Sequence, residues 1–342
     1  MKHSNHHRLL ICLALTVALI LEGCSLHTSP NAQVTVSGFY FDTLVNITIY
    51  GTNDRSPADE CLEICSYYDG LLSMTVESSD ISRINNAGTE PVKVSGETID
   101  LLEYAYRCYE SSDGLLDISV APASRLWMTA RESKKLPDND SISDAVSLTG
   151  LNRLNIDRER SVVSKDIPGL SLDVGALGKG YVADRLKEML VSKGVKSAVI
   201  SLGGNIITIG NRPDGTPFKI GIKQPFSDKG SVAATLNISG MSVVTSGIYE
   251  RYFIVDDKLY HHILNPQTGM PADTDLSSAT IISSSSLDGD ALSTRCLLLG
   301  LDDSMTLIKN TPDAEAVFIT RDNKLHYTEG ADKYLEYFRH CL

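Results

Sequence analysis

One stretch in the middle of the chain, residues 171–184, constrains the fold more than any other. It reads Ser-Leu-Asp-Val-Gly-Ala-Leu-Gly-Lys-Gly-Tyr-Val-Ala-Asp. An apolar run ends near Val174, glycines follow, and from Tyr181 the apolar residues recur at helical spacing until Gly194. The pattern predicts a strand, a tight glycine turn and the start of a helix.

This turn is suited to binding an anion. Gly175, Gly178 and Gly180 leave it without side-chain bulk, and free N–H groups at a helix start favour an anion such as a diphosphate. Lys179 adds a movable positive charge. The spacing G-x-x-G-x-G nevertheless fits neither a P-loop nor the dinucleotide-binding fingerprint. Spacing alone leaves two interpretations, a phosphate site or a closely packed strand–helix turn.

The overall charge argues against one class of partner. The 342 residues include 31 Lys and Arg against 43 Asp and Glu, a net charge of −12, and no basic stretch is interleaved with aromatic residues. We therefore expect no nucleic-acid binding. The length suits one large domain or two joined lobes. Helix and strand patterns alternate irregularly, which predicts the α+β class.

The first residues predict the compartment. Lys2 and Arg8 precede an apolar run, residues 9–21, that is short for a membrane span and typical of a signal peptide. Leu-Glu-Gly-Cys at 21–24 resembles the lipobox of bacterial lipoproteins, in which the cysteine is lipidated; an uncleaved anchor is the alternative. We expect a lipoprotein signal peptide at 1–23, lipidated Cys24 with a tether at 24–35, and an extracytoplasmic domain at 36–342.

Further elements are expected on both sides of the central stretch. The patterns predict a hairpin or strand at 39–51, a helix at 57–72 capped by Ser56, a helix at about 95–111, a surface insertion at 127–149, and a helix at about 288–299. Within the last helix, Asp290 and Thr294 share a face, with Ser293 beside them. Their oxygens suit a hard cation such as Mg²⁺ completed by phosphate and water, although helix capping is the alternative.

A candidate proton acceptor lies in Tyr-His-His-Ile-Leu-Asn-Pro-Gln-Thr-Gly at 260–269. A neutral His262 can take the proton of a hydroxyl nucleophile, although a polar histidine at a strand end is the alternative. His261 is expected to point to the opposite side as a spectator. Motifs of self-contained hydrolases, such as G-x-S-x-G and H-E-x-x-H, do not occur.

Taken in order, these segments resemble the ApbE family, the FAD:protein FMN transferases, from about residue 38 to 300. The central signature L-D-V-G-A-L-G-K-G-Y-x-x-D is matched at 172–184. The other matching segments are Phe41-Asp-Thr, Ile81-Ser-Arg-Ile-Asn85, Gly114-Leu-Leu-Asp117, Leu202-Gly-Gly-Asn205, Thr245-Ser-Gly-Ile-Tyr-Glu-Arg-Tyr-Phe253, His262-Ile-Leu-Asn-Pro-Gln-Thr-Gly269 and Asp290-Ala-Leu-Ser-Thr294.

The resemblance implies mixed sheets with flanking helices, in two closely packed lobes with FAD in the crevice. It implies Mg²⁺-dependent transfer of FMN from FAD to a threonine or serine hydroxyl of an acceptor protein, through a phosphoester bond and with release of AMP. By this resemblance His262 is the catalytic base. The metal site would comprise Asp290, Ser293, Thr294 and the carbonyl of Ala176, and FAD would contact Phe41, Thr75, Gly114, Leu115, Leu116, Asp173, Lys179 and Leu264.

The resemblance also implies the partners. They are acceptor subunits of membrane redox complexes, of the sodium-pumping NADH:quinone oxidoreductase or Rnf type, or other FMN-binding-domain proteins, met from a lipid anchor on the periplasmic or cell-surface side of a bacterial membrane. Thr75, Leu116 and Ile248 depart from the residues common in the family. Residues 275–280 resemble an acceptor sequence but are one residue short, so self-flavinylation is not expected. A Mg²⁺-dependent FAD diphosphatase and a non-catalytic flavin-binding lipoprotein remain alternatives.

Overall fold

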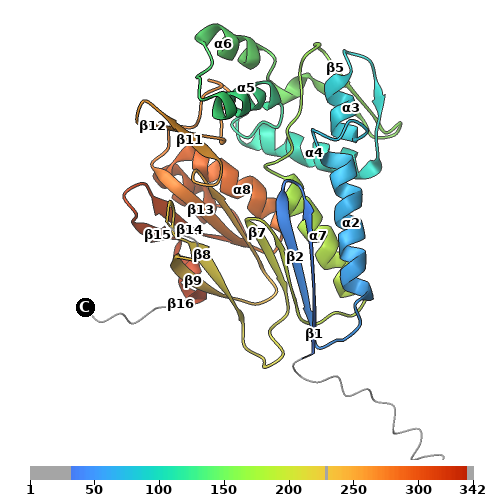
Figure 1. Ribbon diagram of the computed structural model, residues 1–342, viewed down its shortest axis with the longest axis vertical. Coiled ribbons are helices and arrows are strands. Elements are labelled where there is room, and N and C mark those ends of the chain that lie inside the picture. The colour runs from blue at the N-terminus through green and yellow to red at the C-terminus, as the bar shows by residue number, and fades with distance from the viewer. Residues whose placement is uncertain (1–31, 228–229, 337–342) are drawn as a thin grey trace, which may run out of the picture.

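The computed structural model describes residues 32–227 and 230–336 (Figure 1). Its centre is an antiparallel eight-stranded sheet. In spatial order the strands are β1 (Gln33–Tyr40), β2 (Thr43–Tyr50), β6 (Ala198–Leu202), β7 (Asn205–Ile209), β10 (Ser242–Gly247), β13 (Leu276–Ser283), β14 (Ala314–Thr320) and β15 (Leu325–Tyr327).

The first hairpin confirms the pattern at 39–51 and places its turn. Val45, Ile47 and Ile49 are buried along β2 and alternate with more exposed residues, as the period of two predicts. Phe41 and Asp42 both have a φ of 55° and form the turn between β1 and β2. The turn thus holds Phe41 at one end of the sheet.

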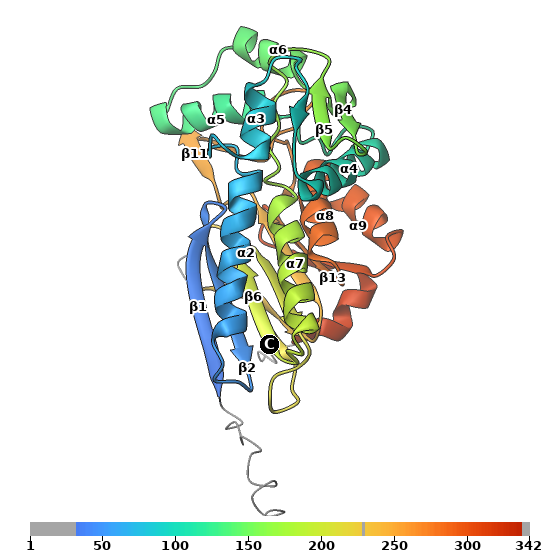
Figure 2. The same ribbon diagram turned by 90° about the vertical axis from the view of Figure 1, so that its right-hand side faces the viewer.

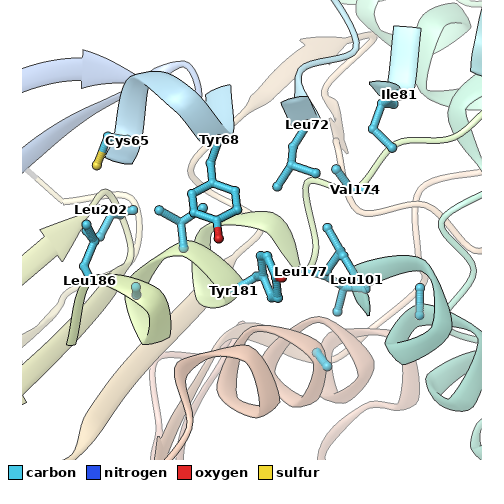
Figure 3. Close-up of a cluster of buried hydrophobic side chains, with 14 of the residues drawn as sticks. Cys65, Tyr68, Leu72, Ile81, Leu101, Val174, Leu177, Tyr181, Leu186 and Leu202 are labelled. Atoms are coloured by element: carbon cyan, nitrogen blue, oxygen red, sulfur yellow. The ribbon is translucent and has the colours of Figure 1, made fainter. Parts of the chain in front are cut away.

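Helices cover one face of this sheet (Figure 2). They are α2 (Ser56–Leu72), α7 (Gly178–Ser192), α8 (Ser286–Leu299) and α9 (Leu301–Lys309). The helix predicted from the central signature is α7, and its first turn packs on α2: the rings of Tyr68 and Tyr181 meet edge to face with centroids 5.6 Å apart, beside Leu72 and Leu177 (Figure 3). Each such buried side chain stabilises the fold by about 1.5–3 kcal/mol.

The other face is covered by a three-stranded sheet of β8 (Phe218–Lys223), β9 (Val232–Ile238) and β16 (Leu335–Glu336). Strand β13 is therefore buried along its whole length: Ile281 packs toward the helices and Ile282 toward β8 and β9. Thr280, in the acceptor-like segment 275–280, has no solvent exposure. Its hydroxyl is closed off by packing, which agrees with the expectation that the chain does not flavinylate this segment.

A second lobe lies above one end of the sheet in Figure 1. It contains α3 (Asp80–Asn86), α4 (Gly96–Ser111), α5 (Ala121–Ser133), α6 (Asn139–Ser147) and the small sheet of β3 (Val92–Lys93), β5 (Val162–Lys165) and β4 (Leu154–Asp157). Between the lobes lies the hairpin of β11 (Tyr252–Val255) and β12 (Lys258–His261). The predicted α+β fold of mixed sheets and flanking helices is confirmed.

The predicted cap of α2 was wrong, and α8 begins two residues before its predicted start. Ser56 lies inside α2, where its N–H and hydroxyl donate to Asp54 at 2.9 and 2.7 Å, and Arg55 takes the cap position without a side-chain bond. Helix α8 begins at Ser286, before Asp288, and Ser285 caps it by accepting the N–H of Asp288 at 3.1 Å.

The prediction that residues 127–149 form a surface insertion was wrong for Trp127, which is buried. Trp127 is only 4% exposed, and its indole N–H donates to the carbonyl of Gly269 at 2.7 Å. It stacks on Tyr260 with ring centroids 5.4 Å apart. The segment therefore holds the loop that follows His262 in place.

The predicted signal peptide and Cys24 lie outside the described residues, as do residues 228–229 and 337–342. Among the helices of residues 32–227 and 230–336, none has the length and apolarity that a membrane span requires.

Candidate functional site

The signature turn is fixed by polar bonds to its backbone. The side chain of Asn85 accepts the N–H of Leu172 at 2.6 Å and donates to its carbonyl at 2.9 Å, so it acts as a partner strand. Asp173 donates its N–H to Ile118 at 2.7 Å, and its carboxylate accepts the N–H of Gly175 at 3.0 Å. Asp173 is half-buried at the entrance of the turn.

Gly180 brings α7 and α8 into contact. A Cβ atom at this position would lie 2.8 Å from the Cα of Leu287, so only glycine fits. Its N–H donates to Oδ2 of Asp290 at 2.9 Å. Asp184, one turn further along α7, accepts the N–H groups of Ser286 and Leu287 at 2.8 and 3.0 Å. The turn predicted to bind phosphate is therefore also a closely packed turn.

Oxygen atoms from three segments gather at this contact. Asp290 is 2% exposed, and Lys179 lies 3.8 Å from its Oδ1 and 2.9 Å from the carbonyl of Gly175. The hydroxyl of Ser246, at the end of β10, is 2.8 Å from that of Ser293 and 3.5 Å from that of Thr294. The structure thus brings the predicted metal residues of α8 together beside the signature turn, which contains Ala176.

The side chains of Asp290, Ser293, Thr294 and Ser246, which we call the oxygen cluster, include one carboxylate. Within residues 32–227 and 230–336, no group of three or more His, Cys, Asp or Glu side chains could hold a metal. An all-oxygen set with a single buried carboxylate fits a hard cation that keeps water and phosphate oxygens as further ligands, and it does not fit zinc.

His262 follows β12 directly. The backbone carbonyl of Arg251 determines which nitrogen of its ring carries the proton. Its backbone N–H donates to the carbonyl of Arg251 at 3.1 Å, and its Nδ1 lies 3.3 Å from the same oxygen. A carbonyl can only accept, so Nδ1 carries the proton and Nε2 is left as an acceptor. Desolvation by surrounding protein lowers the pKa of His262 to about 3, with the charges of Arg251, His261 and Lys179 acting in the same direction. Solvent still reaches the side chain.

His261 has a different environment. It is 3% exposed, its Nε2 lies 3.1 Å from the carbonyl of Ala272, and its Nδ1 accepts the N–H of Ile263 at 3.3 Å. Burial lowers its pKa to about 4. Both ring nitrogens have backbone partners, so His261 is a neutral core residue, whereas Nε2 of His262 has no such partner among the hydrogen bonds of the described residues.

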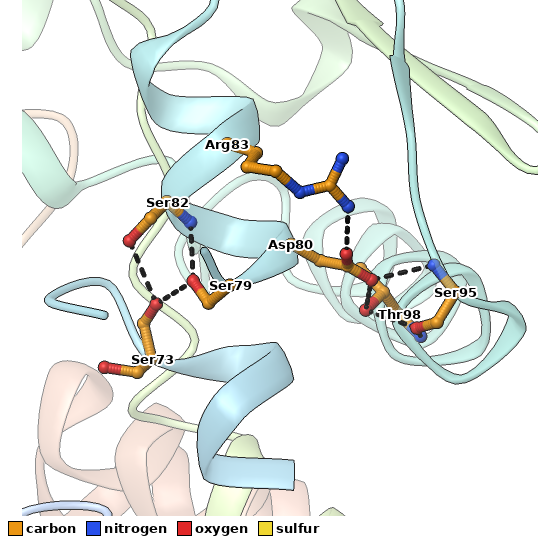
Figure 4. A network of polar contacts seen from close by, with 7 residues as sticks. All are labelled: Ser73, Ser79, Asp80, Ser82, Arg83, Ser95 and Thr98. Carbon is orange, nitrogen blue, oxygen red and sulfur yellow. Dashed lines mark hydrogen bonds and ion pairs between the residues drawn. The ribbon is translucent and has the colours of Figure 1, made fainter. Parts of the chain in front are cut away.

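Two of the predicted flavin contacts lie in loops with defined anchors. The N–H of Phe41 donates to Asp69 at 3.0 Å, and its ring is half-buried. Thr75 is exposed in the loop 73–79. This loop is closed by bonds from the hydroxyls of Ser79 and Ser82 to the carbonyl of Ser73, while the adjoining Asp80 accepts the hydroxyl of Thr98 at 2.7 Å (Figure 4).

The turn at 113–117 is held from beneath by Asp117. Gly114 takes a left-handed φ of 77°, which glycine tolerates best. Asp117 accepts N–H groups of Ser119 and Leu151 at 2.7 and 3.3 Å, and burial raises its pKa. Leu115 is half-exposed, whereas the side chain of Leu116 is buried in the core. Leu264 is likewise buried, beside Trp127.

A cavity of about 330 Å³ lies between α4, α8 and α9, with Tyr104, Asp288 and Arg295 among its lining residues. Of the predicted site residues, Leu116 alone lines it. Asp288 and Arg295 are on the opposite side of α8 from Asp290 and Thr294, so this cavity is separate from the oxygen cluster.

The sequence analysis assigned no role to four residues that hold the site together. Asn85 and Asp184 position the signature turn and α8, Ser246 joins the oxygen cluster, and the carbonyl of Arg251 sets the tautomer of His262. Each lies inside a segment that resembled the ApbE family, which was the available signal. Their partners are 11 to 103 positions away along the chain, so spacing could not reveal the contacts.

Comparisons with known proteins agree with this site. The model of the ApbE family matches residues 41–318. The chain is 34% identical to a FAD:protein FMN transferase of Klebsiella pneumoniae (strain 342), over 87% of this chain and 92% of that protein. It is 30% identical to the FAD:protein FMN transferase of Treponema pallidum (strain Nichols), over 84% of each.

Solved structures show the same fold. The crystal structure of the ApbE protein from Thermotoga maritima superposes with a TM-score of 0.82 at 29% identity, covering 90% of this chain and all of that one. The flavin transferase ApbE from Vibrio cholerae gives a TM-score of 0.77 at 26% identity, covering 89% and 99%. The fold, the motif residues gathered at the α7–α8 contact and these matches agree: the chain belongs to the ApbE family.

Proposed function

We propose that this protein transfers FMN from FAD to a serine or threonine hydroxyl of an acceptor protein. The proposal is carried by the unprotonated Nε2 of His262 and the oxygen cluster around Asp290, with Lys179 lying 3.8 Å from Asp290 and near enough to His262 for its charge to lower the pKa of the imidazole. The relatives named above, FAD:protein FMN transferases, support it.

The step follows from these groups. Nε2 of His262 takes the proton of the acceptor hydroxyl as its oxygen attacks the FMN-side phosphorus of the FAD diphosphate. A new P–O bond joins FMN to the acceptor, the bond from that phosphorus to the bridging oxygen breaks, and AMP leaves with that oxygen. Lys179 offsets the negative charge that builds on the phosphate oxygens; the N–H groups of Gly175, Gly178 and Gly180 already donate to Asp173, Val174 and Asp290.

Mg²⁺ fits the oxygen cluster and forms part of the proposal. Asp290 and Thr294 would hold it, with Ser293 beside them and the carbonyl of Ala176 from the turn. When bound, Mg²⁺ supplies positive charge to the diphosphate. Lys179, 3.8 Å from Asp290, keeps the buried carboxylate compensated.

A matched pair of α8 variants tests the metal site. Asp290→Asn is expected to lower the rate of FAD consumption in Mg²⁺ buffer by about 100-fold or more, since it removes the one buried carboxylate of the cluster. Asp288→Asn, two residues away and exposed, serves as the control and should stay near the wild-type rate. Equal rates for Asp290→Asn and wild type would reject the assignment.

The same site with water as acceptor would be a FAD diphosphatase. Solvent reaches His262, which favours keeping this alternative. It would yield free FMN and AMP from FAD with the acceptor protein unmodified.

We propose further that the enzyme acts at a bacterial membrane surface on subunits of redox complexes. The support is the lipobox-like sequence ending in Cys24. Expressed in a bacterium with its leader, the wild-type chain should sediment with membranes, and Cys24→Ala should be released into the soluble extracytoplasmic fraction. A wild-type chain that is soluble and lacks lipid by mass spectrometry would reject the anchor.

A further inference from the structure

The hairpin of β11 and β12 places an arginine directly across from the candidate catalytic base. Its register pairs Tyr252 with His261. One position further toward the strand ends, the backbone N–H of His262 donates to the carbonyl of Arg251 at 3.1 Å, so these two residues also face each other. Residues that face each other across antiparallel strands extend their side chains on the same side, with Cβ atoms about 5 Å apart. The side chains of Arg251 and His262 therefore leave the hairpin together.

The guanidinium of Arg251 has no ionic partner within residues 32–227 and 230–336. It is exposed, and the adjacent carboxylate, that of Glu250, lies 3.7 Å from the ammonium of Lys223 instead. After burial, the charge of Arg251 is the largest cause that lowers the pKa of His262, which places the guanidinium near the imidazole. By itself this cation makes His262 a weaker base. An anion bound beside both side chains would reverse that effect.

The proposed reaction brings an anion to this position. Nε2 of His262 takes the proton of a hydroxyl about 3 Å away, and that oxygen attacks a phosphorus from about 3–3.5 Å, so the FMN-side phosphate comes within about 6 Å of Nε2. The long side chain of Arg251, which starts about 5 Å from that of His262, can reach a group at this distance. The planar fork of N–H donors on a guanidinium matches two oxygens of a phosphate.

The other donors near the phosphate already have partners. The ammonium of Lys179 lies 3.8 Å from Oδ1 of Asp290 and donates to the carbonyl of Gly175 at 2.9 Å. The glycine N–H groups of the signature turn donate to oxygens of the protein. Arg251 adds a cation whose donors none of the described residues accept, on the side of the site where the proton is transferred.

We propose that Arg251 is a further catalytic residue, whose guanidinium binds the non-bridging oxygens of the phosphate transferred from FAD; this inference rests on the proposed function. The acceptor oxygen bonds to phosphorus while the bond from phosphorus to the bridging oxygen of AMP breaks, and two N–H groups of Arg251 donate to the oxygens that carry the negative charge. The phosphate then lies beside both Arg251 and the imidazolium that forms when His262 takes the proton. It offsets the repulsion between these two cations.

Three variants of the hairpin test this role in FMN transfer to a protein acceptor, with FAD and Mg²⁺ saturating. Arg251→Gln should lower kcat about 100-fold or more, with the KM for the acceptor within about twofold of wild type. Arg251→Lys should lie between them, because an ammonium keeps the charge and lacks the fork. Lys258→Gln is the control: Lys258 is exposed at the other end of the hairpin, opposite Val255, and its loss should leave kcat unchanged. All three variants should keep the wild-type Tm.

The remaining outcomes overturn the inference. A wild-type kcat in Arg251→Gln removes Arg251 from catalysis. A raised KM for the acceptor with kcat unchanged would show that Arg251 binds a carboxylate of the acceptor instead. A kcat loss accompanied by a lower Tm would make its role structural. In each of these cases wild type still transfers FMN, whereas a wild-type chain that transfers none in the presence of FAD and Mg²⁺ would reject the proposed function itself.

Discussion

At the scale of single residues, the site depends on one buried carboxylate and one neutral imidazole. The hydroxyl of Ser293 donates to the backbone carbonyl of Asp290 and meets the hydroxyl of Ser246; among the described residues no second carboxylate joins that of Asp290 in a metal-binding group, so the proposed cation would need phosphate oxygens to complete its shell. His262 has its Nδ1 proton held by Arg251 and its pKa lowered. A base of this kind is ready at neutral pH without first losing a proton.

The lowered pKa of His262 predicts a flat acid limb in the pH–rate profile. A histidine with the ordinary pKa of about 6.5 would be mostly protonated at about pH 5 and lose some 30-fold in rate. Because the surrounding protein and the charge of Arg251 lower the pKa of His262 below its ordinary value, the His262-dependent rate should fall clearly less than this between about pH 7.5 and pH 5. An apparent pKa near 6.5 in kcat, absent from His262→Gln, would contradict this.

His261 predicts a pH dependence of stability instead. Its native pKa of about 4 lies below the unfolded value of 6.5, so below pH 6.5 the unfolded chain takes up a proton that the native state refuses. Its contribution to the free energy of unfolding therefore drops by about 2 kcal/mol from about pH 7.5 to pH 5. Urea unfolding of wild type and His261→Gln at both pH values measures the difference; equal losses in both proteins would refute the assignment.

At the scale of elements, the decisive feature is the contact between α7 and α8. Gly180 lets the helices approach, its N–H binds Asp290, and Asp184 ties down the first turn of α8. This contact sets the position of the carboxylate relative to the glycine turn. The first turn of α7 contains two glycines, Gly178 and Gly180, and only at Gly180 does the neighbouring helix leave no room for a Cβ atom.

Gly180→Ala should damage the site and Gly178→Ala should not. A Cβ at Gly180 would lie 2.8 Å from the Cα of Leu287 in α8, so the helices must separate, with an expected loss of about 1–3 kcal/mol in stability and a weaker Mg²⁺ dependence. A Cβ at Gly178 would lie 3.8 Å from the nearest atom, the side chain of Val174, an ordinary contact. Thermal unfolding and Mg²⁺ titration of both variants decide; similar behaviour of the two would count against the account.

Sequence patterns predicted those helices, strands and turns that depend only on residues close together in the chain. The strand–turn–helix at 171–194, the alternation of β2 and the shared face of Asp290 and Thr294 all follow from spacing. The burial of Trp127 and the bond from the Ser285 hydroxyl to Asp184 depend on partners far away along the chain, and Ser246 joins the cluster from β10. Such contacts require the folded structure, because no periodicity records them.

At the scale of the whole molecule, two lobes meet at one site. The large sheet supplies Ser246, whose hydroxyl meets that of Ser293, and the helices on it supply Lys179 and Asp290. The sequence predicted this α+β arrangement through its resemblance to the ApbE family more than through its composition. Family membership follows from the whole chain, whereas the role of each site residue is a matter for experiment.

The central claim is that FMN moves from FAD onto a protein hydroxyl. Mass spectrometry of residues 25–342 incubated with FAD, Mg²⁺ and a protein carrying a Ser-Gly-Ala-Thr acceptor sequence tests it directly. The account predicts that the acceptor gains the mass of one FMN less one water, and that EDTA abolishes the gain. Free FMN and AMP beside an unmodified acceptor, or FAD left intact, would contradict it.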